Sequence, residues 1–282
     1  MFYKYNKPKG DFANQSVRRL SKQLNTRKIG HTGILDPLAS GLMLVASDFE
    51  TKMLQYIPNK NKIYIANCDF GFMSDTYDVT GEIQNTNDAT VQFEQLKDAS
   101  NKMLDCTEQI PPIYSAKKIN GKKAYEYARE NKQVEMRVQK IKINKCDLLN
   151  FNSLKQTAEF LMDVSEGTYI RTVLVDIAKL CNTHAIMTDL KRVKVGNIEL
   201  GNLESGQIEQ INYEDLFDNQ IIPLEEKMVS SLSNGAKVKV NANDGLCFIK
   251  NPHLNLVCAI GQVENGYFKP SKISHERLVW KK

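Results

Sequence analysis

Metal ligands and disulfide-forming residues are scarce in this sequence of 282 residues. The six cysteines never form a CxxC pair, and the four histidines stand far from them along the chain. This spacing fits neither a zinc site nor a disulfide framework, so buried free thiols are the better interpretation. We therefore expect no metal and no disulfide.

Long apolar runs are also missing. Because no stretch of about 18 apolar residues exists, nothing is expected to span a membrane. The opening MFYKYNKPKG lacks the apolar segment that a signal peptide needs after its basic start, which predicts a cytoplasmic protein. With 41% hydrophobic and 25% charged residues, the composition is typical of a globular protein with room for a catalytic domain and a small second module.

Positive charge is modest overall, at +5, but it is concentrated in one segment. Between Pro112 and Lys145, ten Lys or Arg residues stand against three acids, whereas residues 203–226 contain seven acids and no Lys or Arg. A phosphate backbone would bind such a basic segment. A solvated, ion-paired face has the same composition, so charge alone leaves both interpretations open.

The hydrophobic pattern predicts an α+β protein. Apolar residues at helical spacing favour helices over residues 14–24, 49–57, 93–103 and 170–180. Short apolar runs at 42–46 and 62–70 are typical of strands, and the second run is apolar on both faces, as inside a sheet. Helices that alternate with non-adjacent strands indicate a mixed sheet.

The composition changes after Glu226. From residue 227 onward, short β-prone runs alternate with turn signals such as NG and DG. We expect two domains, residues 1–226 and a small β domain of residues 227–282. The second is near the lower size limit for independent stability, so it is expected to lean on the first.

The loop GHTGILDPLASG, residues 30–41, holds one His and one Asp among small residues. On local pattern alone, Asp36 before Pro37 is most typical of a turn or cap. A metal site at His31 and Asp36 has no further ligand to support it, and the loop lacks the GxxxxGK[ST] pattern that cradles phosphates. Pattern alone does not identify the loop.

This loop closely resembles the catalytic loop of the TruB family of tRNA pseudouridine synthases, usually GHTGTLDPLATG. Further motifs follow in the family's order over most of residues 1–200: KPKG at 7–10, YDVTGEI at 77–83, IPPIYSAKKINGKKAYEYAR at 110–129, GTYIRT at 167–172 and LKRVKVG at 190–196. The resemblance implies the pseudouridine synthase fold, a mixed, mainly antiparallel sheet flanked by helices. The tail, with AIGQVENGYFKPSKI at 259–273, looks like a reduced PUA domain, a small RNA-binding β module.

The implied activity is isomerisation of uridine to pseudouridine at position 55, in the T-loop of tRNA. The N-glycosidic bond breaks, the base turns while held, and a C-glycosidic bond forms. No electrons are transferred overall, so no cofactor is expected. The implied partner is tRNA, bound by a monomer without a protein partner.

By the same resemblance, three residues carry the chemistry. Asp36 is the carboxylate that acts as nucleophile or otherwise engages the ribose. Arg171 is the cation that keeps Asp36 ionised under bound RNA, an interpretation strengthened because a helix start does not favour a cation. Tyr64 stacks on the target base; without the family it would be an ordinary aromatic residue of the sheet.

Other residues are implied to bind the substrate. His31 fills the place that the flipped base leaves, while Tyr169 and Leu190 contact the flipped nucleotide, although Leu190 also suits a core position. Residues 110–145 match the family's RNA-gripping insertion. The lysines expected to bind RNA are Lys7, in the KPKG motif, and Lys117, Lys118, Lys122 and Lys123 in the insertion.

Two departures and two alternatives remain. Asn6 stands where the family usually has Asp, and Ala13-Asn14 where Thr-Ser is common.

A non-catalytic RNA chaperone would not need Asp36, Tyr64 and Arg171 together, because a desolvated carboxylate facing an anionic ligand is unfavourable. A guide-RNA-dependent synthase shares the catalytic loop but works with protein partners.

Overall fold

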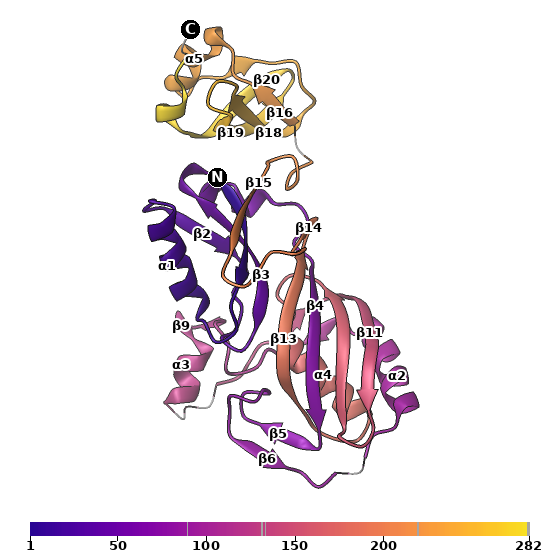
Figure 1. The fold of residues 1–282 in the computed structure, drawn as a ribbon. Helices are drawn as coiled ribbons and strands as arrows, with labels where there is room; N and C mark the ends of the chain where they lie inside the picture. Colours follow the sequence, from indigo (N-terminus) through magenta and orange to yellow (C-terminus); the bar gives the residue numbers. More distant parts are fainter. Residues whose placement is uncertain (89, 131, 133, 219, 281–282) are drawn as a thin grey trace.

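A nine-stranded sheet forms the body of the molecule (Figure 1). The computed structural model describes residues 1–88, 90–130, 132, 134–218 and 220–280. Strands run in the order β11-β12-β4-β13-β3-β1-β15, with β14 beside β13 and β2 beside β3. Their bounds are β1 Phe2–Lys7, β2 Ile29–Thr32, β3 Ser40–Ser47, β4 Lys62–Phe70, β11 Ile143–Asn152, β12 Thr157–Val164, β13 Ala185–Val195, β14 Ile198–Glu199 and β15 Ile208–Ile211.

Only one contact in this sheet is parallel, the short pairing of β13 with β3. The other neighbours are antiparallel. The predicted fold class, a mixed and mainly antiparallel sheet with flanking helices, is therefore confirmed.

Three of the four predicted helices are present: α1 Ala13–Gln23, α2 Phe93–Lys102 and α4 Ile170–Leu180. The helix predicted over residues 49–57 is wrong, because the segment forms two 3-10 turns instead, η1 Asp48–Lys52 and η2 Leu54–Tyr56. The segment begins at Asp48, whose left-handed backbone (φ +56°) cannot be part of a regular α-helix, and it ends before Pro58, which disfavours the α conformation of the residue before it.

The unbroken apolar run of strand β3 results from its position between two hydrophobic clusters. Met43 and Val45 lie in the main cluster with α1, α2 and α4. Leu42 and Leu44 point to the opposite face of the sheet and belong to a second cluster that includes Phe248. Because alternate side chains of a strand point to opposite faces, both sets are buried and the pattern loses its alternation.

A five-stranded sheet lies at the other end of the molecule (Figure 1). Its order is β16-β18-β19-β20-β17, and the helix α5, Glu226–Ser233, packs near it. The strands are β16 Gln220–Pro223, β17 Val238–Lys239, β18 Gly245–Asn251, β19 Leu256–Glu264 and β20 Tyr267–Ile273. This sheet thus begins before residue 227, the boundary expected from composition, and residues 281–282 lie outside the described part of the chain.

A buried ionic contact joins the segment that follows β3 to the segment that follows β20. The Glu50 carboxylate, 0% exposed, accepts hydrogen bonds from Arg277 at 2.6 and 3.0 Å and from the Tyr213 hydroxyl. Around it, the ring centroids of Phe217 and Phe248 lie 5.0 Å apart. Burial is the largest influence and would raise the pKa of Glu50, but the Arg277 guanidinium, the N-terminal ammonium of Met1 at 2.7 Å and the Tyr213 hydroxyl together outweigh it and lower that pKa.

The basic segment folds into small elements, drawn below α1 in the view of Figure 1. A hairpin of β8 with β9 turns at Asn120-Gly121, both with positive φ, and leads into helix α3. The remaining short elements are β5 Phe72–Ser74, β6 Ile83–Asn85, η3 Met103–Asp105, β7 Glu108–Gln109, β8 Lys118–Ile119, β9 Lys122–Lys123, α3 Ala124–Arg129, β10 Gln139–Lys140 and η4 His275–Arg277.

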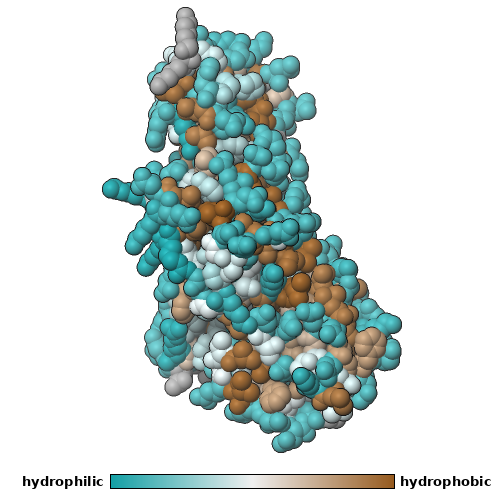
Figure 2. Space-filling model, in the orientation of Figure 1, coloured by the Kyte–Doolittle hydropathy of each residue, from teal (hydrophilic) through white to brown (hydrophobic). Residues whose placement is uncertain are grey.

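The surface on the side of α1 is mainly hydrophilic, and brown hydrophobic areas lie over the large sheet (Figure 2). Within the described ranges, no helix combines the length and the apolar character needed to cross a membrane.

Candidate functional site

The GHTGILDPLASG loop connects β2 with β3 and is fixed at both ends. At its end, Gly41 has φ +103°, and a Cβ there would lie 2.3 Å from the Arg192 carbonyl oxygen. That contact brings Gly41 opposite Arg192 in the parallel pairing of β3 with β13. At its start, the Arg192 side chain donates to the Gly33 carbonyl at 3.1 Å, and it also donates to Leu42 at 2.6 Å. Glycine is required at Gly41 because no side chain fits there.

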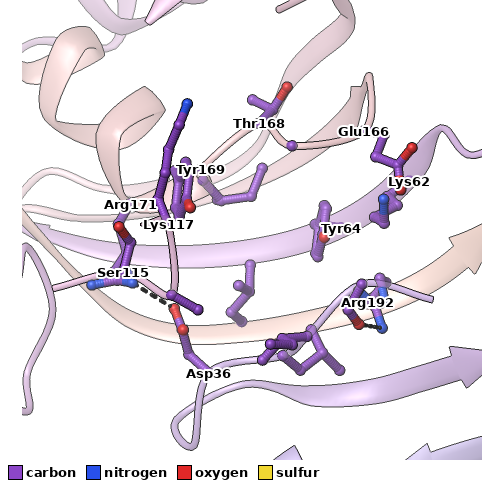
Figure 3. Close-up of a pocket in the computed structure, with 17 residues that line it drawn as sticks. Asp36, Lys62, Tyr64, Ser115, Lys117, Glu166, Thr168, Tyr169, Arg171 and Arg192 are labelled. Atoms are coloured by element: carbon purple, nitrogen blue, oxygen red, sulfur yellow. Dashed lines mark hydrogen bonds and ion pairs between the residues drawn. The ribbon is translucent and has the colours of Figure 1, made fainter. Parts of the chain in front are cut away.

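The loop lines a cavity of about 360 Å³, in the size range of sites for small ligands. It is bounded by the loop, by β4 and β13, and by the start of α4 (Figure 3). Six residues predicted from the sequence line it: Asp36, Tyr64, Lys117, Tyr169, Arg171 and Leu190.

Asp36 and Arg171 form an ion pair at 2.9 Å across the cavity wall. The Arg171 side chain is 4% exposed and the Asp36 side chain 39%, so the carboxylate is open to the cavity while the guanidinium is buried. Arg171 also donates to the carbonyls of Thr76, at 2.8 Å, and Tyr114, at 3.0 Å. Four partners surround the guanidinium, whose rigid fork of donors fits such an arrangement.

Asp78 is the fourth partner, with its carboxylate 3.7 Å from Arg171 and 5% exposed. It is itself held by the Thr76 hydroxyl at 2.8 Å and the Thr80 amide at 2.9 Å. Arg171 is therefore flanked by one fixed, buried acid and one accessible acid. The sequence pattern contained Asp78 in YDVTGEI but gave no reason to single it out.

Tyr64 and Leu190 form the floor of the cavity. They lie on neighbouring antiparallel strands, where Tyr64 is paired with Arg192 and Leu190 with Ala66. Both side chains are 6% exposed, which leaves an apolar surface on which a flat ring can stack. Tyr169 is held on another wall by Gln109, whose amide bonds both the backbone N–H and the carbonyl of Tyr169 at 2.8 and 3.0 Å. Burial raises the pKa of Tyr169.

Five predicted residues lie outside the cavity lining. His31 is on β2, partly buried, and burial lowers its pKa. Lys7 is fully buried and donates to the Pro8 and Asp11 carbonyls at 2.8 and 2.7 Å, so its ammonium braces the chain turn after β1. The other three are on the β8–β9 hairpin: Lys118, Lys122 and Lys123.

Two of the hairpin lysines have local partners. Lys122 is ion-paired with Glu130 and lies 4.9 Å from the Tyr127 ring. Lys123 lies 5.4 Å from the Tyr125 ring. Lys118 is exposed, and Lys117 reaches from the cavity and donates to the side-chain amide oxygen of Gln139, Oε1, at 2.5 Å. The hairpin is a cationic edge next to the cavity mouth.

The structure adds four cavity residues that sequence reasoning did not single out. Ser115, Lys62, Glu166 and Arg192 all line the cavity, and Figure 3 shows Lys62 and Arg192 together, on the side away from Asp36. The Ser115 hydroxyl and the Arg192 Nη1 have no hydrogen-bond partner among the described residues. Arg192 lay within the LKRVKVG motif, and Lys62 opened the β4 run, but only the folded sheet brings them together.

In the described part of the chain, no group of three or more His, Cys, Asp or Glu side chains is arranged to hold a metal ion. The polar groups of the cavity are instead acids, lysines, arginines and hydroxyls. Such groups can pair with a ribose, a base and phosphates.

Residues 21–170 match the family described as TruB family pseudouridylate synthase (N terminal domain). The chain is 37% identical over 279 residues to the tRNA pseudouridine synthase B of Mesomycoplasma hyopneumoniae (strain 232), covering 96% of this chain and 82% of that protein. It is 34% identical over 278 residues to the enzyme of the same name from Mycoplasmopsis pulmonis (strain UAB CTIP), covering 99% and 96%.

Solved structures share the fold at low sequence identity. One, the crystal structure of a Cbf5-Nop10-Gar1 complex, contains a chain that matches with a TM-score of 0.68 at 18% identity, covering 98% of this chain and 86% of that one. A chain of the archaeal box H/ACA sRNP Nop10-Cbf5 complex matches with a TM-score of 0.66 at 16% identity, covering 100% and 88%. At these identities the likeness concerns the fold.

Proposed function

The chain belongs to the TruB family of pseudouridylate synthases and isomerises uridine to pseudouridine in tRNA, and from this premise we propose that Asp36 is the carboxylate that acts on uridine 55 of the T-loop. One observation supports this assignment above the others. Asp36 is accessible from a cavity of nucleotide scale, and a buried arginine holds it at 2.9 Å.

The reaction needs an ionised carboxylate beside the ribose while RNA covers the site. A carboxylate can form and release an ester-like bond at carbon, and a nearby cation favours its charged form. Arg171 supplies that cation, and because its side chain is 4% exposed it leaves the cavity itself free for the substrate. Asp78 and two carbonyls keep the guanidinium in place.

The remaining cavity residues suit a base that has left the RNA stack. Extrusion of a nucleotide costs a few kcal/mol, which stacking and edge contacts must offset. We assign the stacking surface to Tyr64 and Leu190 and the opposite wall to Tyr169. His31, at the start of the loop and with its Nδ1 without a hydrogen-bond partner among the described residues, is proposed to occupy the position that the base vacates.

Phosphate contacts are assigned to the basic insertion of residues 110–145. Its lysines, including Lys117 at the cavity and Lys118 on the hairpin, line one edge of the site. We propose that the C-terminal part of the chain, which we place at residues 227–282 together with β16, is an RNA-binding unit of the PUA type. The protein is proposed to act as a monomer in the cytoplasm, without a cofactor, guide RNA or protein partner.

Tritium release tests this function directly. An unmodified tRNA transcript carrying tritium at uridine C5 is incubated with the wild type and with Asp36→Asn, an isosteric change that removes the charge. Because the C5 hydrogen is lost only when C5 bonds to the ribose, we expect release by the wild type and none by the variant. A companion transcript with cytidine at position 55 should release no tritium with the wild type.

The alternatives predict different results. A binding protein without activity would release no tritium from any transcript, and a guide-dependent enzyme would be inactive on transcript alone. Release by Asp36→Asn at the wild-type rate would remove Asp36 from the mechanism.

A further inference from the structure

Lys62 and Arg192 form a buried cationic pair in the cavity wall. Their side chains are 5% and 0% exposed. Both approach Gly33 from the same side, since a Cβ placed there would lie 3.4 Å from Arg192 Nη1 and 3.6 Å from Lys62 Nζ. Neither has a carboxylate oxygen within 4.0 Å among the residues that the structure describes, and Arg192 Nη1 has no hydrogen-bond partner.

Such a pair is unfavourable unless something negative approaches it. Buried charges in proteins are normally paired, because desolvation of an unpaired ion is costly. Burial, with a further contribution from Arg192, lowers the pKa of Lys62 to about 8. Lys62 donates to the Lys60 carbonyl at 3.2 Å, which leaves two of its three N–H groups available.

The pair lies across the cavity from the reacting carboxylate. Figure 3 shows Asp36 and Arg171 on one side, Lys62 and Arg192 on the other, and Tyr64 between them. Lys62 and Tyr64 are two residues apart on β4, so they share a face, and Arg192 is the register partner of Tyr64. A ring stacked on Tyr64 with its ribose at Asp36 therefore directs its far edge to Lys62.

The chemistry of uracil defines what that edge presents. The ring atom opposite N1 is C4, and the one opposite C5 is C2, and each carries a carbonyl oxygen. Half a turn of the base about the line through N3 and C6 exchanges N1 with C5 and O4 with O2. The far edge consequently presents a carbonyl oxygen both before and after the base turns.

We propose that Lys62, supported by Arg192, donates a hydrogen bond to the outer carbonyl oxygen of the uracil and stabilises the anion formed when the glycosidic bond breaks. This inference rests on the proposed function. The electron pair of the C1′–N1 bond leaves with the base and spreads over N1, O2 and O4. When C5 bonds to C1′, the C5 proton is lost and N1 takes up a proton, so the atoms balance. Lys62 stays protonated and serves both orientations of the ring.

The test separates this role from a phosphate contact. Single-turnover tritium release and tRNA affinity by filter binding are measured for the wild type, Lys62→Met and, as a control, Lys97→Met, an exposed lysine on α2. We expect Lys62→Met to lower the rate constant about 100-fold, as for loss of one oxyanion donor, with the affinity unchanged. A weaker affinity with an unchanged rate would identify a phosphate contact and overturn the proposal, as would a wild-type rate.

The pH profile provides a second readout. Facing Lys62 are Glu166 before α4, Arg192 on β13 and Lys60 beside β4, while Asp36, Tyr64, Lys117, Tyr169 and Arg171 line the rest of the cavity. The wild-type rate should fall above about pH 8, where Lys62 loses its proton. In Lys62→Arg the new guanidinium stays protonated, so the variant should remain active without the fall in rate above about pH 8. The same fall in rate in this variant would overturn the proposal. Tritium release by the wild type but not by Asp36→Asn shows separately that the proposed function stands.

Discussion

Asp36 and Arg171 meet at 2.9 Å, and only the arginine is buried. The acid comes from a loop near the start of the chain and the base from helix α4, so a contact between distant segments leaves the acid open to the cavity. An exposed acid with a hidden base can pair with a new ligand without moving its own counter-charge.

Replacement of Arg171 by Lys tests this arrangement. A lysine keeps the charge, but its single nitrogen cannot occupy both the Nη1 position that donates to the Thr76 carbonyl and the Nη2 position that reaches Asp36 and the Tyr114 carbonyl. We expect single-turnover tritium release to fall about 100-fold, because a small misplacement of a catalytic group has an effect of this order. The affinity for tRNA should stay near the wild-type value. Near-normal turnover by Arg171→Lys would mean that charge alone suffices.

The four lysines expected to bind phosphates are tested together. Simultaneous replacement of Lys117, Lys118, Lys122 and Lys123 by Ala should weaken tRNA binding and reduce the slope of log affinity against log salt by up to about 3. Filter binding over a range of salt concentrations gives the slope. A control variant in which two exposed lysines outside the insertion are replaced by Ala, Lys97 on α2 and Lys155 in the β11–β12 turn, should keep the wild-type slope. Equal slopes for the two variants would argue against the insertion as the phosphate-binding edge.

Gly41→Ala should disturb the catalytic loop. Its Cβ would lie 2.3 Å from the Arg192 carbonyl oxygen, and φ is +103°. We expect backbone strain to lower the free energy of unfolding by about 1–3 kcal/mol. We also expect the rate of tritium release to fall, because Asp36 shifts with the loop. The control is Gly71→Ala, where φ is also positive at +81° but a Cβ meets nothing within 4 Å. Urea unfolding and tritium release are measured for both variants, because Gly71→Ala has only the backbone strain and Gly41→Ala has the strain and the steric clash. Equal losses of stability and activity in the two variants would contradict the prediction.

Stability should depend on pH through Glu50. Its folded pKa lies below the ordinary value of 4.5, so its contribution is complete above about 4.5 and is lost as pH falls through the folded pKa. Glu50→Gln should cost about 3 to 5 kcal/mol near neutral pH, because it breaks a buried pair with Arg277, and it should flatten the acid limb of the stability curve. Urea midpoints from neutral pH down to about 3 measure both effects. An acid limb of wild-type steepness would assign it to other carboxylates.

Much of the fold follows from local pattern. Helices α1, α2 and α4 and strand β4 lie where apolar spacing predicted them, because each buries one face against the main core. The segment after Ser47 was predicted as a helix because Phe49, Met53 and Ile57 have helical spacing. The structure has two 3-10 turns there, between a left-handed Asp48 and Pro58, and the spacing of apolar residues does not reveal them.

Only part of the candidate site could be predicted from the sequence. Asp36, Tyr64 and Arg171 were predicted as site residues through the family motifs, and the structure places all three in one cavity. No periodicity in the sequence connects a loop near residue 36 with a helix near 171. Lys62 escaped notice because KIYIANCDF was interpreted as apolar on both faces. In the structure one face of β4 carries Lys62 and Tyr64 side by side, and burial of that lysine depends on β13 and the catalytic loop.

The apolar cluster shared by the two sheets has a consequence for how the enzyme can be shortened. Phe248, Val257 and Ile260 of the small sheet cover Leu42 and Leu44 of β3. A chain cut before β16 would expose the underside of the strand that closes the catalytic loop. Loss of the C-terminal part would therefore cost the loop its support as well as any RNA contact.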